Sequence, residues 1–508
     1  MKRKIIYTTF FLAGILSAFS CKKNFLDVPV QGQATTATDP SLAQNLVIGV
    51  YNSLLTGEAF GGNDIHGFGF ISATNIMSDD ADKGSTPDDQ LLVIGPFDNF
   101  TTLSSTNTFV SALWSGYYNG IARTNQALAA LSTAAIDTAA KNTLQAEVRF
   151  IRGYYYFNLV RFFGAVPRVL RVPTSAADAN ADPAFQTRAS ADTIYNSVII
   201  PDLQYGVDHL PVKGQKGYSI GHVTKGAAES MLAKVYMYRK NWPQVLNLTQ
   251  DVINSGQYSL VPDYATIWRQ AGDNSSESIF EIETGQFNNT DFGVQNYCTA
   301  QGPRVGGKGG WSDLGFGFCN PSTDLINAYE ANDKRKAATI IFIDNSGTHI
   351  GTTLFDGFRI PSSDSVQNLF YNYKAYHSEN GFESYLGNRD FKQKNLHILR
   401  YAEVLLMNAE AAAQQGNPGL ALTALNMVRT RAGLPSAGIA DQNAIWKERR
   451  VELAMEHDRF WDIVRQGRAS QVMQAAGKAF VAGKHELLPV PGVQIQLSGN
   501  KLTQNPGY

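Results

Sequence analysis

The stretch LQAEVRFIRGYYYFNLVRFFGAVP, residues 144–167, is the strongest indication of the fold in this chain. Its apolar residues recur at steps of three and four, which places them on one face of a helix. Those residues are Val148, Ile151, Tyr155, Leu159 and Phe162. Gly164 and Pro167 come next and are typical of a helix end. The stretch therefore predicts a helix that begins near residue 144 and ends before Gly164.

Most other periodic segments follow the same pattern, so we predict a mainly α protein. The expected helices cover residues 42–55, 109–131, 194–203, 225–238, 245–253, 401–413, 420–431 and 445–464. Between them lie four long segments rich in Gly, Asn, Asp and aromatic residues, at 57–70, 77–103, 285–321 and 341–396. Such long loops are uncommon unless they are functional or disordered, and the aromatic residues argue against disorder. We expect them to form excursions on a helical scaffold, with a few short strands such as 278–283.

Two predicted helix pairs resemble tetratricopeptide repeats, in which a small residue on the first helix lets the second pack closely. Ala233 precedes Val245, and Ala409 precedes Ala421, both at a spacing of 12 residues. Such a pair cannot bury its apolar face alone. We therefore expect the two pairs to stack on one another.

The N-terminal sequence is typical of an export signal followed by a lipid attachment site. Lys2, Arg3 and Lys4 precede an apolar run that is too short to span a membrane, and Cys21 follows. We predict a signal peptide at 1–20, an acylated Cys21 with a tether at 21–38, and a single helical domain at 39–508, with halves of about 39–260 and 261–508. A plain secretory signal with an incidental cysteine is the alternative.

The net charge and the cysteines bear on the partners of the protein and on its disulfide content. The formal net charge is −1 and no cluster of Lys and Arg is present, which argues against nucleic acid as a partner. Beyond the leader, no apolar stretch is long enough for a membrane helix. Cys298 and Cys319 share one Gly-rich segment, and in an exported protein they form either a disulfide or two buried thiols. The sequence leaves that choice open.

Several motifs in a fixed order resemble the SusD/RagB family of outer-membrane nutrient-binding lipoproteins. They are FLDVP at 25–29, EVRFIRGYYYF at 147–157, FGAVP at 163–167, GHVTKGAA at 221–228, RYAEVLLMNAEA at 400–411, LNMVRTRAG at 425–433, ERRVELAMEHDRFWD at 448–462, LPVP at 488–491 and LTQNPGY at 502–508. The resemblance covers nearly the whole chain. It implies a SusD-like fold in which four helix-turn-helix repeats form the scaffold and the loops carry a carbohydrate-binding surface.

The resemblance also implies a function and partners. The protein would be a lipid-anchored, cell-surface protein of the outer membrane that captures oligosaccharides or polysaccharides. It would deliver them to a SusC-type TonB-dependent transporter, without a cofactor and without catalysis. A tetratricopeptide-type adaptor for other proteins and a glycoside hydrolase are the alternative functions.

Candidate ligand residues follow from the chemistry of sugars, whose C–H faces pack on flat rings and whose hydroxyls need a few placed polar groups. Trp311 lies in a Gly-rich context that favours exposure of its ring. The other candidates are Tyr297, Phe316, Phe318, Phe68 and Phe70 as ring surfaces, and Asp80 and Arg304 as polar groups. The alternative is that these aromatic residues form a small core of the loops themselves.

Three further motifs suggest catalysis or ion binding, and each has a simpler explanation. Glu448, Glu452 and Glu456 are spaced by four residues among arginines, which favours a structural ion network over an acid/base pair. The segment 302–308 resembles a phosphate loop, but Gly309 and Gly310 follow where a hydroxyl and a helix are needed. The aspartates in 79–89 lack the spacing of a calcium loop, so a solvated acidic loop is expected. We predict no metal site.

Overall fold

The computed structural model describes residues 39, 41–57, 62–284, 295–304, 315–343, 348–377 and 394–508. The leader, Cys21 and the tether lie outside these described residues. Within them, no helix has the length and apolar character needed to cross a membrane.

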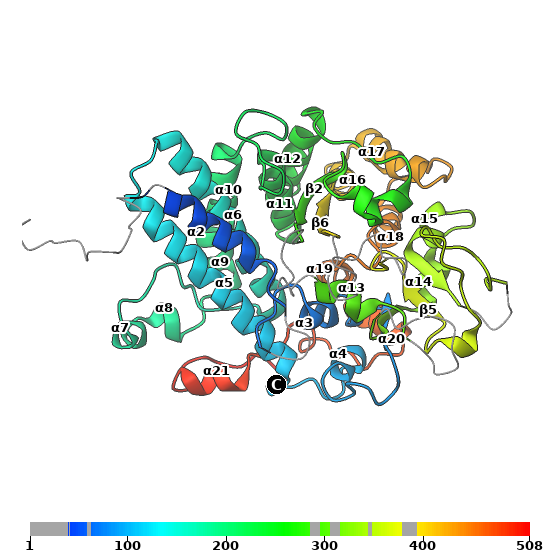
Figure 1. Cartoon of the computed structure of the whole chain (residues 1–508), viewed down its shortest axis with the longest axis horizontal. Coiled ribbons are helices and arrows are strands. Elements are labelled where there is room, and N and C mark those ends of the chain that lie inside the picture. The colour runs from blue at the N-terminus through cyan, green and yellow to red at the C-terminus, as the bar shows by residue number, and fades with distance from the viewer. Residues whose placement is uncertain are drawn as a thin grey trace, which may run out of the picture.

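Helices dominate the described part of the chain, as predicted (Figure 1). The α-helices are α2 (Ser41–Ser53), α3 (Phe68–Ile71), α4 (Gly95–Asn99), α5 (Thr108–Thr133), α6 (Thr138–Phe163), α7 (Ala176–Ala181), α8 (Pro183–Gln186), α9 (Ala191–Ile194), α10 (Ile200–His209), α11 (Lys225–Tyr238), α12 (Trp242–Asn254), α13 (Gln295–Gln301), α14 (Thr323–Ala328), α15 (Lys334–Thr339), α16 (Tyr401–Gln414), α17 (Pro418–Arg431), α18 (Gln442–Glu452), α19 (Arg459–Arg465), α20 (Ala469–Ala475) and α21 (Gly492–Leu497). Two π-helical turns, η3 (Ser72–Ile76) and η4 (Tyr195–Ile199), and three 3₁₀ turns, η5 (Tyr264–Trp268), η6 (Gln270–Gly272) and η7 (Ser363–Ser365), complete the helical elements.

The strands are short and form three separate antiparallel pairs. They are β1 (Ala81–Gly84) with β3 (Phe318–Pro321), β2 (Ser278–Ile282) with β6 (Leu396–Arg400), and β4 (Ile340–Phe342) with β5 (Phe370–Asn372). All lie in or beside the long segments between the main helices, and β2 confirms the predicted strand at 278–283. The β1–β3 pair joins the segments 77–103 and 285–321, whereas β4 and β5 both lie in or beside the segment 341–396.

The helix of the stretch quoted above, α6, lies at the centre of the N-terminal half, next to α5 and α10 (Figure 1). It begins at Thr138, six residues before the expected start, because the Asp137 carboxylate accepts hydrogen bonds from Ala139 N (3.0 Å) and Ala140 N (3.2 Å). It ends at Phe163, where Gly164 has a φ of 69°. From Ala146 onward nearly every side chain is buried, which makes α6 a core helix.

The two predicted repeat pairs are α11 with α12 and α16 with α17, and they stack through contact between α12 and α16. Ala233 on α11 and Ala409 on α16 are fully buried. Asparagine caps the second helix in both pairs, with Asn241 accepting from Gln244 N and Asn417 from Leu420 N. The tetratricopeptide-like scaffold is thus present as two similar pairs.

The single helix predicted at 445–464 is wrong: α18 ends at Glu452 and α19 begins at Arg459. Met455 and His457 between them have positive φ values of 65° and 75°. Asn75 on η3 holds this break, since its side-chain amide donates to Met455 O and its oxygen accepts from His457 N. Long-range hydrogen bonds therefore override a helical periodicity.

One large hydrophobic core extends from Ala43 to Leu502. Two smaller cores accompany it. One lies around β4 and β5 and includes Ile341 and Tyr371, and the other lies around η5 and includes Trp268.

Candidate functional site

The predicted ring surfaces on α3, Phe68 and Phe70, lie in the core, with exposed fractions of 1% and 2%. The ring of Phe70 packs on His457 with centroids 4.7 Å apart. Phe68 contacts Phe316 and Phe318 at 5.9 and 5.8 Å. Their role as an exposed platform is therefore a wrong prediction for this structure, and the alternative of an internal aromatic core applies to them.

Glycine explains why this segment resembles an exposed loop in sequence. The Asp64 carboxylate caps α3 by accepting from Gly67 N (2.7 Å) and Gly69 N (2.6 Å). A Cβ on either glycine would lie 3.1 Å from the same carboxylate. The glycines permit a tight capped turn that buries both phenylalanines.

Tyr297 on α13 and Phe318 on β3 are also buried, with exposed fractions of 7% and 2%. The hydroxyl of Tyr297 lies 3.4 Å from Met455 O, and its ring packs against His457. Phe316 alone among the described ring candidates is partly exposed. Tyr297 and Phe318 are therefore core residues, which corrects their prediction as exposed ring surfaces, and Phe316 is partly exposed.

Trp311 lies outside the described residues, as does most of the phosphate-loop-like segment 302–308. Its role in ligand binding stays a prediction.

Arg304 forms a polar cluster with two residues of the segment after β1. Its guanidinium donates to the Asp89 carboxylate and to Ser85 Oγ (2.6 Å), and Ser85 Oγ donates to Asp89 (2.9 Å). The side chains of Arg304 and Asp89 are 35% and 25% exposed, so both reach solvent. The cluster therefore presents fixed donors and acceptors of the kind that bind sugar hydroxyls.

Asn368 extends this polar cluster. Its amide donates to Ser85 O (3.3 Å), while its buried side-chain oxygen has no hydrogen-bond partner among the described residues. Leu92, with an exposed fraction of 86%, lies in the same segment as Asp89. We call Ser85, Asp89, Arg304 and Asn368 the Arg304 cluster. Sequence reasoning missed Ser85 and Asn368, because only the fold brings them beside a residue more than 60 positions away.

Asp80 is not available to a ligand, which corrects its prediction as a binding residue. Its exposed fraction is 1%, and its carboxylate lies 2.7 Å from Arg450 Nε. The neighbouring Asp79 binds Arg459 through two contacts of 2.7 Å. Burial acts to raise the pKa of Asp79, but Arg459 and Arg450 outweigh burial, so this pKa is lowered. The pKa of Asp80 is raised, because burial is the largest effect there. The expected solvated acidic loop is, at these two residues, a buried ion network.

The three glutamates of 448–456 are also structural, as predicted, although their partners come from elsewhere in the chain. Glu452 is fully buried and contacts Arg335 (3.1 Å), Arg400 (2.9 Å) and Arg431. Burial acts to raise the pKa of Glu452, and these arginines lower it well below its usual range. A carboxylate held ionised in this way cannot act as a general acid. We call Glu452 and its three arginines the Glu452 network.

Cys298 on α13 and Cys319 on β3 are buried and unbonded to each other. Burial raises the pKa of the Cys319 thiol. Of the two alternatives left open by the sequence, the structure has the pair of buried thiols.

Two family descriptions match the chain. The SusD family matches residues 276–508, and a family described as starch-binding and associating with the outer membrane matches residues 73–237. "SusD-like protein P2" of Formosa agariphila is 28% identical over 441 residues, which cover 81% of this chain and 83% of that protein.

Solved structures agree over almost the whole length. A laminarin binding SusD-like protein is 28% identical, with a TM-score of 0.74 over 92% of this chain and 99% of that one. Surface glycan-binding protein A from Bacteroides fluxus is 26% identical, with a TM-score of 0.76 over 93% of this chain and 100% of that one. The family resemblance and the SusD-like fold are thereby confirmed.

Proposed function

The chain belongs to the SusD/RagB family, and on that premise we propose that it binds a glycan at the outer membrane and delivers it to a TonB-dependent transporter. The observation that carries the proposal is the match of nearly the whole chain to a laminarin binding SusD-like protein. Adaptor contacts through the tetratricopeptide-like pairs are compatible with this role, because delivery requires docking on the transporter.

We propose that the binding surface combines the Arg304 cluster, the half-buried Phe316 and Trp311. The cluster supplies a guanidinium and a carboxylate that reach solvent, and an aromatic ring beside them would stack on a sugar face. Phe316 packs on the buried Phe68, which in turn contacts the buried Phe318.

Binding is tested with purified protein on a panel of polysaccharides that includes laminarin and starch, by affinity electrophoresis and calorimetry. We expect saturable binding to at least one glycan of the panel. Arg171→Ala is a suitable control, since this arginine is paired with Asp178 and Asp182 in an exposed segment well outside the Arg304 cluster. Absence of binding to every member of a broad panel would contradict the proposal.

We propose that the protein is not a hydrolase, which the ionised state of Glu452 supports. Incubation with the bound glycan is expected to release no reducing ends. Release of reducing ends by the purified wild type would favour the hydrolase alternative.

The lipid anchor remains a proposal as well. We expect Cys21→Ala to leave the outer-membrane fraction after a high-salt wash, because the acyl chains supply the attachment. Recovery of this variant in the membrane fraction would show that another contact holds the protein there.

A further inference from the structure

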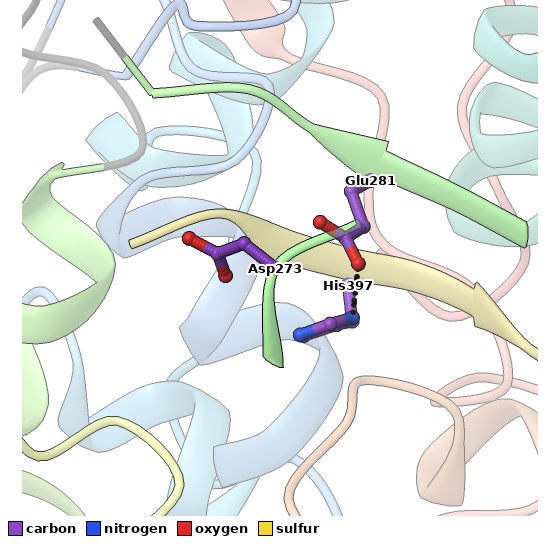
Figure 2. Close-up of side chains that lie close together, drawn as sticks. All are labelled: Asp273, Glu281 and His397. Carbon is purple, nitrogen blue, oxygen red and sulfur yellow. Dashed lines mark ion pairs between the residues drawn. The ribbon is translucent and has the colours of Figure 1, made fainter. Parts of the chain in front are cut away.

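Three ionisable side chains from separate elements meet beside the β2–β6 pair (Figure 2). Asp273 directly follows η6, Glu281 lies on β2, and His397 lies on β6. Glu281 and His397 are partners in the strand register, and the pairing is irregular between Phe280 and Glu281. Such irregularities often re-aim a side chain, here towards a residue of the preceding turn.

The His397 ring is buried and held in one orientation. Its Nε2 lies 3.0 Å from Ile267 O, so it donates there and leaves Nδ1 on the side of the two carboxylates. Histidines that bind metals almost always donate their other ring N–H to a carbonyl or a carboxylate. Nδ1 lies 3.0 Å from Glu281 Oε1, but no described residue makes a hydrogen bond of good geometry with it.

The two carboxylates are similarly placed. Glu281 is fixed by hydrogen bonds from Asn274 N (3.0 and 3.2 Å) and from the Asn395 amide (3.0 Å). Asp273 Oδ1 is buried, and no described residue supplies it with a hydrogen bond. His397 Nδ1 and Asp273 Oδ1 are thus two buried atoms of one cluster that lack such a bond. Buried polar atoms of this kind are commonly satisfied by a bound ion or a water.

The spacing of the three groups suits a cation. One ligand atom from each of the three lies within 4.8 Å of the other two. A tetrahedral metal at about 2.1 Å from each of its ligands holds every pair of ligand atoms about 3.4 Å apart. The contact of 3.0 Å between His397 and Glu281 is close to this spacing, and Asp273, the least buried of the three, would complete the set by moving inward.

We propose that Asp273, Glu281 and His397 bind one divalent transition cation of the Zn²⁺ type, which clamps the turn after η6 to the β2–β6 pair. Imidazole favours such cations over Ca²⁺ and Mg²⁺. Glu281 also lines a small polar pocket, together with Lys213, Asn274 and Glu283. The site is independent of glycan binding.

The test uses the full-length mature protein without a polyhistidine tag, stripped with a chelator and titrated with Zn²⁺ by calorimetry. We expect one Zn²⁺ per chain, a weaker affinity for Ca²⁺, and a higher Tm with Zn²⁺ because the ligand binds the folded state. Asp273→Asn and His397→Gln should each weaken Zn²⁺ binding at least about tenfold. Asp273→Asn is the safer variant, because its side chain is the least buried of the three.

His209→Gln is the matched control, since His209 packs on Tyr205 within α10, outside the cluster and outside the pocket that Glu281 lines, and it should bind Zn²⁺ like the wild type. An anomalous diffraction peak between the three side chains would place the ion directly. Equal Zn²⁺ binding by the wild type and Asp273→Asn, tighter binding of Ca²⁺, or no saturable binding would each overturn the proposal. The last result would leave the cluster as a buried ion pair between a protonated His397 and Glu281.

Discussion

The Glu452 network and the Arg304 cluster are both built from arginine and carboxylate, yet they differ in their access to water. Arg335 and Arg400 in the network are at most 1% exposed. Arg304 and Asp89 keep about a third and a quarter of their side-chain surface exposed. A buried pair that loses one partner leaves an uncompensated charge, whereas an exposed pair contributes little to stability. Burial therefore separates the arginines that hold the fold from those that can exchange a partner for a ligand.

The largest effect is expected from Glu452→Gln. This change leaves three buried arginines with less negative charge, so we expect the free energy of unfolding to fall by about 3–5 kcal/mol in urea titrations. Glu330→Gln is the control, because Glu330 pairs with Arg429 at a partly exposed position and should cost about 1 kcal/mol or less. Equal losses in the two variants would remove the distinction between buried and exposed pairs.

The pH dependence of stability offers a second test that Glu452 is buried and ionised in the folded protein. The pKa of Glu452 is lowered in the folded protein, because its arginines outweigh burial. Its contribution is therefore fully present above the unfolded value of about 4.3 and is lost as the pH falls towards the folded pKa. The stability difference between the wild type and Glu452→Gln should be constant above about pH 5.5 and should shrink below about pH 4.5. A difference that stays constant to pH 3 would mean that Glu452 is not held ionised.

The binding surface is expected to respond in affinity and not in stability. Trp311→Ala should weaken glycan binding by about 2 kcal/mol or more in calorimetry, as aromatic hot spots commonly do, with an unchanged Tm. Trp242→Ala, on the first turn of α12, is a control that should leave the affinity unchanged. Normal affinity in Trp311→Ala would place the aromatic platform elsewhere.

Helix periodicity predicts the scaffold well because it depends on neighbours in sequence. The bounds of α11, Lys225–Tyr238, match the expected 225–238. The break between α18 and α19 could not be found in this way, since it depends on Asn75, far away in the chain.

The candidate site was harder to predict for a related reason. Phe68 and Phe70 resemble exposed loop residues until the Asp64 cap is known. Arg304 was identified as a polar candidate, but its partners Ser85 and Asn368 come near it only in the folded chain. Residue type indicates the chemistry of a site, and long-range packing decides which residues reach solvent.

The most direct test of the central claim is calorimetry of Arg304→Ala with a glycan that the wild type binds. We expect about a tenfold loss of affinity, because a hydrogen bond to a charged group contributes about 1.5 kcal/mol or more. The free energy of unfolding should change by less than about 1 kcal/mol, because the pair with Asp89 is partly exposed. Unchanged affinity, or a loss of stability as large as that of Glu452→Gln, would contradict the account.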